Sequence, residues 1–173
     1  MASDLEEFRQ AKDDFFRSNL QSPLTRTQKK TFRGLAYFPE NPALRLTVVV
    51  EPFAMQDEIE VQTSSGDVQM YRRYGRFSFG VEGQTAELTI YLQGDGYFLP
   101  FVDALAGRET YPAGRYLEPE QLPDGRFLVD FNLAYNPYCA YNERWSCPLT
   151  PFENRLKVAV RAGEQLFPDA GHE

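Results

Sequence analysis

Hydrophobic residues recur at helical spacing along the start of the chain. They are Leu5, Phe8, Ala11, Phe15, Phe16 and Leu20. Because residues three, four and seven apart share one face of a helix, this spacing predicts an amphipathic helix over residues 3–20, which Ser3 and Glu6 begin as a capping box. Ser22 can cap a second, short helix with Pro23 in its first turn, and the FPENP sequence that follows would end it.

From Leu44 the pattern changes to runs of strand-like residues separated by short turn sequences. The turns are AMQD, SSGD, VEGQ, QGDG and LPDG, and the runs are LRLTVVVEPF, EIEVQT, VQMYRRY, RFSFGV, AELTIYL, YFLPFV, RYLEP, RFLVDFN and NRLKVAVRA. These runs are rich in β-branched and aromatic residues, which is typical of strands. In AELTIYL the apolar residues alternate with Glu87, Thr89 and Tyr91, which predicts one buried and one solvated face.

The strand pattern predicts a mainly β fold, an antiparallel hairpin meander that forms a sandwich or a barrel and carries N-terminal helices. We expect a single β-rich domain over residues 1–167, with a β-core over residues 44–161. Within it, residues 130–154 hold three prolines, which remove backbone donors, so this Pro/Asn/Tyr-rich stretch is expected to be a long irregular loop. Residues 168–173 are expected to be a disordered tail.

Charge and hydropathy restrict the partners. The chain has 18 basic and 25 acidic residues, and its net charge of -7 disfavours nucleic acid and anionic lipid. Its N-terminus lacks the basic and apolar regions of a secretory signal, and no apolar run reaches membrane-spanning length. We therefore expect a cytoplasmic protein with no nucleic-acid or membrane partner, in which the cysteines would stay mostly reduced.

Candidate chemistry is narrowed by the single histidine, His172, which lies in the predicted tail. Ser-His-Asp and Cys-His catalysis and histidine metal sites all need a positioned imidazole, so they are excluded, and we predict no metal site. The sequence indicates no particular cofactor. Cys139 and Cys147 fit four states: reduced structural thiols, a local disulfide, a zinc site with two further ligands, or a catalytic thiolate with Arg144 as the nearby cation.

The RFLVDFN run has an apolar face and a second face with polar side chains. Its alternation places Phe127, Val129 and Phe131 on the first face, and Leu128, Asp130 and Asn132 on the second. If the Pro-rich loop folds over the second face, it encloses a polar cavity. The residues expected there are Asp130, Asn132, Tyr135, Asn136, Tyr141, Asn142, Glu153 and Asn154. Two alternatives are a plain solvent face and a plug whose Asn and Asp side chains bond their own backbone.

Our first hypothesis is a binding module for a small polar molecule. Arg115 would pair with an anionic group of the ligand, the loop's Asp and Asn side chains would orient it, and Tyr135 and Tyr141 would form flat walls. A hard cation such as calcium or magnesium is a further ligand that these oxygens would suit.

The second hypothesis is a hydrolase-like enzyme that works without histidine. Asp130 and Glu153 would act as base and acid, with Tyr135 or Tyr141 as proton donor, or Cys139 would act as nucleophile.

A third hypothesis makes the loop a homodimer interface anchored by Trp145, Tyr138 and Phe152.

Three stretches resemble a known family: FLPFVDALAGRETYPAGRYL, VDFNLAYNPYCAYNERWSCPLTPFENRL and AGE. They are similar to the bacterial and archaeal family catalogued as domain of unknown function 1684, from the first helix to Glu164. The resemblance implies no particular activity, substrate or cofactor. The family pattern has Thr and Gly where this chain has Leu105 and Pro112. The positions that match are Asp103, Gly107, Thr110, Tyr111, Gly114, Arg115, Tyr116, Asp130, Asn132, Tyr135, Asn136, Cys139, Tyr141, Asn142, Cys147, Glu153 and Asn154.

Overall fold

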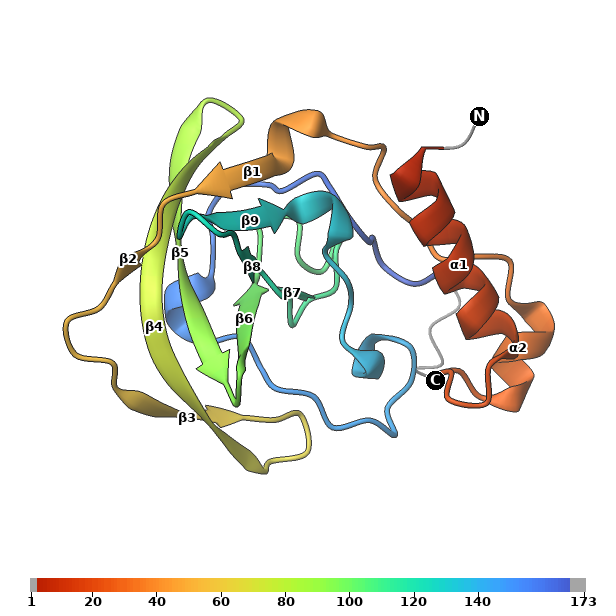
Figure 1. The fold of residues 1–173 in the computed structure, drawn as a ribbon. Coiled ribbons are helices and arrows are strands. Elements are labelled where there is room, and N and C mark those ends of the chain that lie inside the picture. Colours follow the sequence, from red (N-terminus) through yellow and green to blue (C-terminus); the bar gives the residue numbers. More distant parts are fainter. Residues whose placement is uncertain (1–2, 169–173) are drawn as a thin grey trace.

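The computed structural model describes residues 3–168 and is mainly β, as predicted (Figure 1). Two helices precede the strands: α1 (Asp4–Ser18) and α2 (Arg26–Thr31). The strands are β1 (Arg45–Val48), β2 (Glu51–Pro52), β3 (Glu58–Gln62), β4 (Val68–Val81), β5 (Gln84–Gln93), β6 (Gly96–Phe101), β7 (Arg115–Leu117), β8 (Glu120–Gln121) and β9 (Phe127–Asp130). Four short 3-10 helices are η1 (Pro42–Leu44), η2 (Phe131–Leu133), η3 (Tyr138–Ala140) and η4 (Phe152–Asn154).

The strands form two antiparallel sheets that do not close into a barrel, so the barrel alternative is wrong. The larger sheet has the order β2-β4-β5-β6-β7, with β3 also paired to β4, and the smaller sheet has the order β1-β9-β8. β4 joins two of the predicted runs into one strand of 14 residues, with a register shift between Arg73 and Gly75. At Gly75 a Cβ would lie 2.6 Å from the carbonyl oxygen of Glu51, so the close approach of β2 needs glycine here.

The main core lies between the two sheets. It includes Phe77 and Phe79 of β4, Leu88 and Ile90 of β5, Leu99 and Phe101 of β6, and Phe127 and Val129 of β9. The apolar face predicted for RFLVDFN is therefore confirmed, since Phe131 joins the same cluster and stacks on Phe79 with ring centroids 5.1 Å apart.

The predicted solvated face of β5 is wrong at two positions. Thr89 is 5% exposed and Tyr91 is 0% exposed, whereas Glu87 is exposed as expected. The chain around η4 covers this face, because Asn154 accepts a hydrogen bond from the Thr89 amide at 2.9 Å and donates to the Thr89 carbonyl at 2.8 Å. Glu153 accepts from the Tyr91 hydroxyl beside it. β5 is thus buried on both faces from Leu88 to Tyr91.

The helices begin where side chains can cap them. Ser3 accepts from the Glu6 amide at 3.1 Å and starts α1 as predicted. The predicted start of the second helix at Ser22 is wrong, because Thr25 and Gln28 form the capping box of α2. Ser22 instead donates to the Phe16 carbonyl at 2.7 Å, which holds the turn after α1. α2 ends at Thr31, before the FPENP sequence.

The predicted last strand, NRLKVAVRA, is not a strand. Its alternation is real, since Val158 and Val160 are buried in the main core. Its backbone, however, bonds partly to the chain after β6: the Leu156 amide donates to the Val102 carbonyl at 2.7 Å, and the Val160 amide donates to the Asp103 carboxylate at 2.8 Å. At Val160 the Asp103 carboxylate therefore accepts the hydrogen bond that a partner strand would otherwise accept. The predicted tail lies outside the described residues except for Pro168.

The segment after β9 lies between the sheets and the helices. Figure 1 shows the large sheet at one end of the molecule, α1 and α2 at the other, and residues 131–150 between them. Phe16 of α1 contacts Tyr141 of this segment edge to face, with ring centroids 4.9 Å apart. Neither helix among residues 3–168 is long and apolar enough to cross a membrane.

Candidate functional site

The structure distributes the predicted site residues among three places instead of one cavity. Asp130 and Asn132 lie at the end of β9, where η2 begins. Asn132 is buried because this 3-10 turn redirects its side chain, so the predicted outward position is wrong. Its amide accepts from the Asn41 N–H at 2.8 Å and donates to the Asn41 carbonyl at 2.9 Å, while Asp130 pairs with Arg45 at 3.2 Å. These two residues hold the loop before β1 in place.

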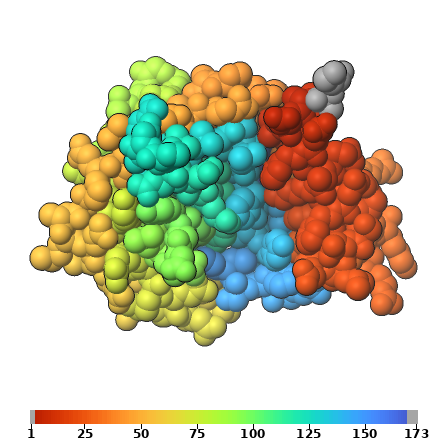
Figure 2. Space-filling view, in the orientation of Figure 1, coloured from red at the N-terminus to blue at the C-terminus, as the bar shows by residue number. Residues whose placement is uncertain are grey.

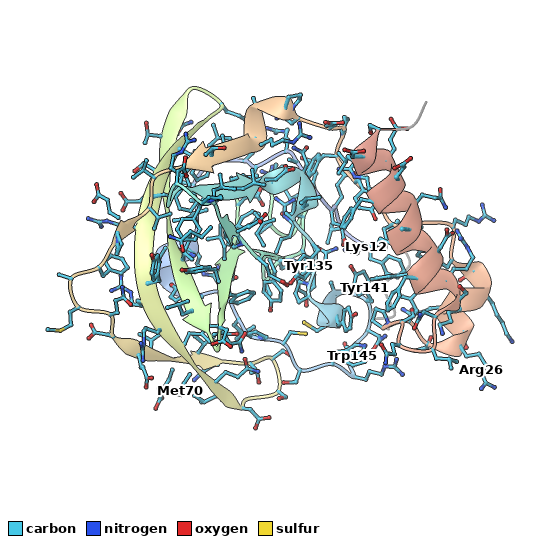
Figure 3. The ribbon with its side chains drawn as sticks, viewed as in Figure 1. Lys12, Arg26, Met70, Tyr135, Tyr141 and Trp145 are labelled. Carbon is cyan, nitrogen blue, oxygen red and sulfur yellow. The ribbon has the colours of Figure 1, made fainter. Side chains whose placement is uncertain are left out.

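A second group surrounds the buried carboxylate of Glu164, which is 1% exposed. Tyr141 donates its hydroxyl proton to this carboxylate at 2.7 Å, and Lys12 of α1 forms an ion pair with it. Asn136 donates its backbone N–H to the same carboxylate at 3.3 Å. Figure 3 shows Lys12, Tyr135 and Tyr141 together between α1 and the sheets. The group ties the first helix to the end of the described chain.

Asn142 completes the anchoring of the helices. Its side-chain amide donates to the Pro23 carbonyl at 2.7 Å, and the Trp145 indole donates to the same oxygen at 3.0 Å. Trp145 also packs on Tyr138 within the chain, with ring centroids 5.1 Å apart, whereas Phe152 is 86% exposed. The homodimer that these aromatic residues suggested stays a prediction.

The third group lies on the covered face of β5. Glu153 accepts two hydrogen bonds from the Arg73 guanidinium, at 2.7 and 3.0 Å, and one from Tyr91 at 2.5 Å. Burial opposes ionisation, but the hydrogen bonds from Arg73 and Tyr91 hold the pKa of Glu153 below its usual value. Glu153 and Asp130, the predicted acid and base, therefore bond to different partners.

Arg115 is not available to a ligand, which corrects its predicted role. Its side chain is 1% exposed, and its guanidinium donates to the carbonyls of Val160 at 2.9 Å and Glu164 at 3.1 Å. Asp103 lies 3.7 Å away as its counter-ion. Burial lowers the pKa of Arg115 to about 10, with Asp103 opposing the shift. The buried Arg115 side chain thus holds the extended chain over residues 160–164 in place through hydrogen bonds to its carbonyl groups.

The loop does border a cavity, at Tyr135 and Pro148. This aromatic cavity has a volume of about 470 Å³. It is lined by Gln69, Tyr71, Gln93, Gly96, Tyr97, Phe98, Tyr116, Glu118, Tyr135 and Pro148. It lies where the ends of β4, β5, β6 and β7 meet the segment after β9, and Figure 2 shows the green β5–β6 turn beside cyan and blue residues of the segment on this face.

Polar groups of the aromatic cavity are arranged around one carboxylate and two amides. The Tyr135 hydroxyl donates to Glu118 at 2.5 Å. Burial and this hydrogen bond raise the pKa of Tyr135 above its usual value, so the tyrosine stays protonated. Gln69 accepts from the Tyr71 hydroxyl at 3.1 Å and from the Gln93 amide at 3.2 Å. Burial raises the pKa of Tyr71 to about 12.

A second, more apolar cavity of about 380 Å³ shares the Glu118–Tyr135 pair. Phe8 of α1, Leu117, Leu128 and Leu133 line it, with Asp130 and Glu120 at its polar positions. The pair therefore contributes to two concave surfaces. Sequence reasoning found Tyr135 but missed Glu118, Gln69 and Gln93, because only the strand pairing brings these three together.

The two cysteines are free thiols, and both are buried. The Cys139 amide donates to the Cys147 sulfur at 3.4 Å, so the residues are neighbours without a bond between them. Among residues 3–168, no cluster of three or more His, Cys, Asp or Glu side chains is placed to hold a metal ion.

Fold and site together define a mainly β protein of two open antiparallel sheets, with N-terminal helices packed on the segment after β9. A family model described as "Protein of unknown function (DUF1684)" matches residues 30–165. The chain belongs to this family, as the motif resemblance indicated.

Comparison with solved structures finds five matching chains. The chain is similar to an uncharacterised protein of Haloarcula marismortui whose structure was determined in solution by NMR: the two are 36% identical with a TM-score of 0.71, over 97% of this chain and 94% of the other. No curated protein matches the chain. The comparisons therefore give the family and the fold, and the site must be interpreted from its own chemistry.

Proposed function

We propose that the protein binds a small, positively charged, hydrogen-bonding molecule in the aromatic cavity. The observation that carries this proposal is the Glu118 carboxylate, which stands at the wall of a cavity lined by five aromatic side chains and two glutamines. The cavity volume of about 470 Å³ falls within the range of small-molecule sites, about 300–1,000 Å³.

Charge favours a cation over the anion that Arg115 suggested. Glu118 is the only charged side chain among the cavity's lining residues, and the net charge of the chain is -7. The faces of tyrosine rings attract cations, by about 0.5–2 kcal/mol for each contact. Lys12 of α1 already makes such a cation–π contact, since its ammonium lies 5.2 Å from the centroid of the Tyr135 ring. A ligand ammonium placed near Glu118 would be stabilised in the same way.

Orientation would come from the amides. Each glutamine carries a donor and an acceptor, so Gln69 and Gln93 suit a ligand that has hydroxyl or amine groups besides its charge. The second cavity shares Glu118 but is lined mostly by apolar side chains, and it offers no comparable set of amides. We therefore place the ligand in the aromatic cavity.

The test compares matched ligands by thermal denaturation and calorimetry. Choline and spermidine are the cationic probes, and 3,3-dimethylbutan-1-ol is the uncharged carbon isostere of choline. A bound cation at a hundred times its Kd stabilises the fold by about 2.7 kcal/mol, which raises Tm by about 5–10 °C for a chain of this length. The uncharged isostere should give no such shift.

Two variants identify the site. Glu118→Gln should weaken cation binding at least about tenfold, because it removes the counter-ion at the cavity wall. Glu120→Gln is the matched control: it lines only the second cavity and should leave binding in the aromatic cavity unchanged. Absence of a shift with both cations, or an equal shift in Glu118→Gln, would refute the proposal.

A further inference from the structure

Cys139 and Cys147 lie close together within the segment after β9. Cys139 belongs to η3, and Cys147 directly precedes Pro148. The Cys147 thiol hydrogen-bonds to the Cys139 sulfur, and the Tyr111 hydroxyl donates to that sulfur at 3.5 Å. With the Cys139 amide 3.4 Å from the Cys147 sulfur, the two thiols are held as a pair by contacts from both sides.

Both thiols are buried, with Cys139 6% and Cys147 8% exposed, but only Cys139 borders a cavity. A cavity of about 460 Å³ opens beside Cys139 and is lined by Ser64, Ser65, Tyr111, Glu143, Arg144, Trp145 and Ser146. Cys147 is not among the residues that line it. A small molecule that enters this cavity therefore meets Cys139.

The surroundings also shift the pKa values of the two thiols in opposite directions. Hydrogen bonds from Cys147 and Tyr111, opposed by burial, lower the pKa of Cys139 to about 6. The same pairing and burial raise the pKa of Cys147. Other titratable or charged groups that face the pair are Tyr116, which interacts with both sulfurs, and Glu143 and Arg144 at the cavity. Cys139 therefore carries the thiolate and Cys147 the proton.

We propose that Cys139 and Cys147 form a redox-active dithiol that is oxidised to a disulfide by small hydroperoxides. The Cys139 thiolate attacks one peroxide oxygen, the O–O bond breaks, and the departing oxygen takes up a proton as water or an alcohol. Cys139 is then a sulfenic acid. The Cys147 sulfur attacks it, an S–S bond forms, the S–O bond breaks, and the thiol proton leaves with the hydroxide as water. Two thiols are oxidised for each peroxide reduced.

The first measurement uses the unaltered protein. After treatment with one equivalent of hydrogen peroxide, the denatured chain should be lighter by two hydrogen atoms and should have lost both thiols to alkylation. Dithiothreitol should restore both. Because these are the only cysteines in the chain, the assay has no other thiol to count. A chain that keeps two reactive thiols, or gains oxygen without forming the disulfide, would overturn the proposal.

The pH profile of alkylation separates a perturbed thiolate from an ordinary buried thiol. With a pKa of about 6, the rate at Cys139 rises about tenfold from about pH 5 to pH 7 and then levels off. An ordinary thiol rises about a hundredfold over that interval and continues to rise to about pH 9. A profile of the ordinary kind would refute the assigned roles.

Two variants test the order of the steps. Cys147→Ser should accumulate a mass increase of one oxygen on Cys139, and this product should react with a sulfenic-acid reagent such as dimedone. Cys139→Ser should leave Cys147 unreactive to peroxide. If a serine variant does not fold, Tyr111→Phe retains the ring and should slow alkylation at about pH 6 by removing the hydroxyl donor. Peroxide reaction at Cys147 in Cys139→Ser as fast as at Cys139 in the native chain would overturn the proposal.

Discussion

Replacing Lys12 by methionine should destabilise the fold, because it leaves the Glu164 carboxylate buried without its ion-pair partner. Lys12 is the only basic side chain in contact with this carboxylate among residues 3–168, and its other contacts are the rings of Phe16 and Tyr135 at 5.7 and 5.2 Å. A hydrogen bond to a charged group contributes about 1.5–3 kcal/mol, and each cation–π contact about 0.5–1 kcal/mol. Methionine keeps the packing of the aliphatic stem. We expect a net loss of about 2–4 kcal/mol.

The assay is urea unfolding followed by the fluorescence of the single tryptophan and by circular dichroism. A double-mutant cycle with Lys12→Met, Glu164→Gln and both together isolates the pair, with an expected coupling of about 1–3 kcal/mol. Arg161→Met is the matched control, because Arg161 and Glu82 form an ion pair whose side chains are 50% and 45% exposed. It should change stability by less than about 0.5 kcal/mol. A coupling between Lys12 and Glu164 as small as this would refute the reasoning.

Two further changes test the covered face of β5. Glu153 has a pKa lowered by Arg73 and Tyr91, so its contribution to stability is present above its unfolded pKa, about 4.3, and is lost as pH falls through the lower folded value. Urea midpoints from pH 7 to about pH 3 should therefore fall more steeply in the native chain than in Glu153→Gln, and parallel curves would contradict this. Asn154→Ala should cost about 2–4 kcal/mol in urea unfolding, because Asn154 is 0% exposed and two backbone groups of Thr89 lose their partner; a loss below about 1 kcal/mol would show that water replaces the amide.

The alternation of residues along a run predicted the buried positions well where every second residue faces the core. Phe127 and Val129 alternate with solvent-side residues in β9, and the core-facing positions are buried as expected. The same rule failed for Tyr91, because the chain around η4, 62 residues away in sequence, covers the second face of β5. Periodicity reports which residues share a face, but it does not report what lies against that face.

The extended chain over residues 156–164 shows a second limit. Its alternating valines are those of a strand, yet the partners of its backbone include the side chains of Asp103 and Arg115. No local rule predicts that two buried ionic side chains will take the place of a neighbouring strand. For the same reason Arg115 was predicted as a ligand contact, because its neighbourhood in the sequence shows only a positive charge near polar residues. The tertiary structure shows that this guanidinium is bound by backbone carbonyls and by Asp103 inside the protein.

The candidate site was predicted in part. The composition of residues 130–154 drew attention to a segment with many side-chain hydrogen bonds. The plug alternative holds where Asp130 accepts from the Asn132 N–H and Asn142 accepts from the Arg144 N–H. It fails for the side-chain amides of Asn132 and Asn142, which bond to distant backbone at Asn41 and Pro23. Both Gln69, on β4, and Glu118, directly after β7, lie outside that segment at positions that carry no distinguishing motif. Sites built across strands become visible only when the pairing is known.

The ion pair between Lys12 and Glu164 also has a consequence for the order in which the chain folds. Its two residues are separated by 152 positions, so closing this contact restricts almost the whole chain at once. Other contacts of α1 close shorter loops: Arg9 donates to the Phe38 carbonyl, 29 positions away, and Asp13 accepts from the Leu35 amide, 22 positions away. The ion pair between α1 and Glu164 can therefore form only when the two ends of the described chain are brought together.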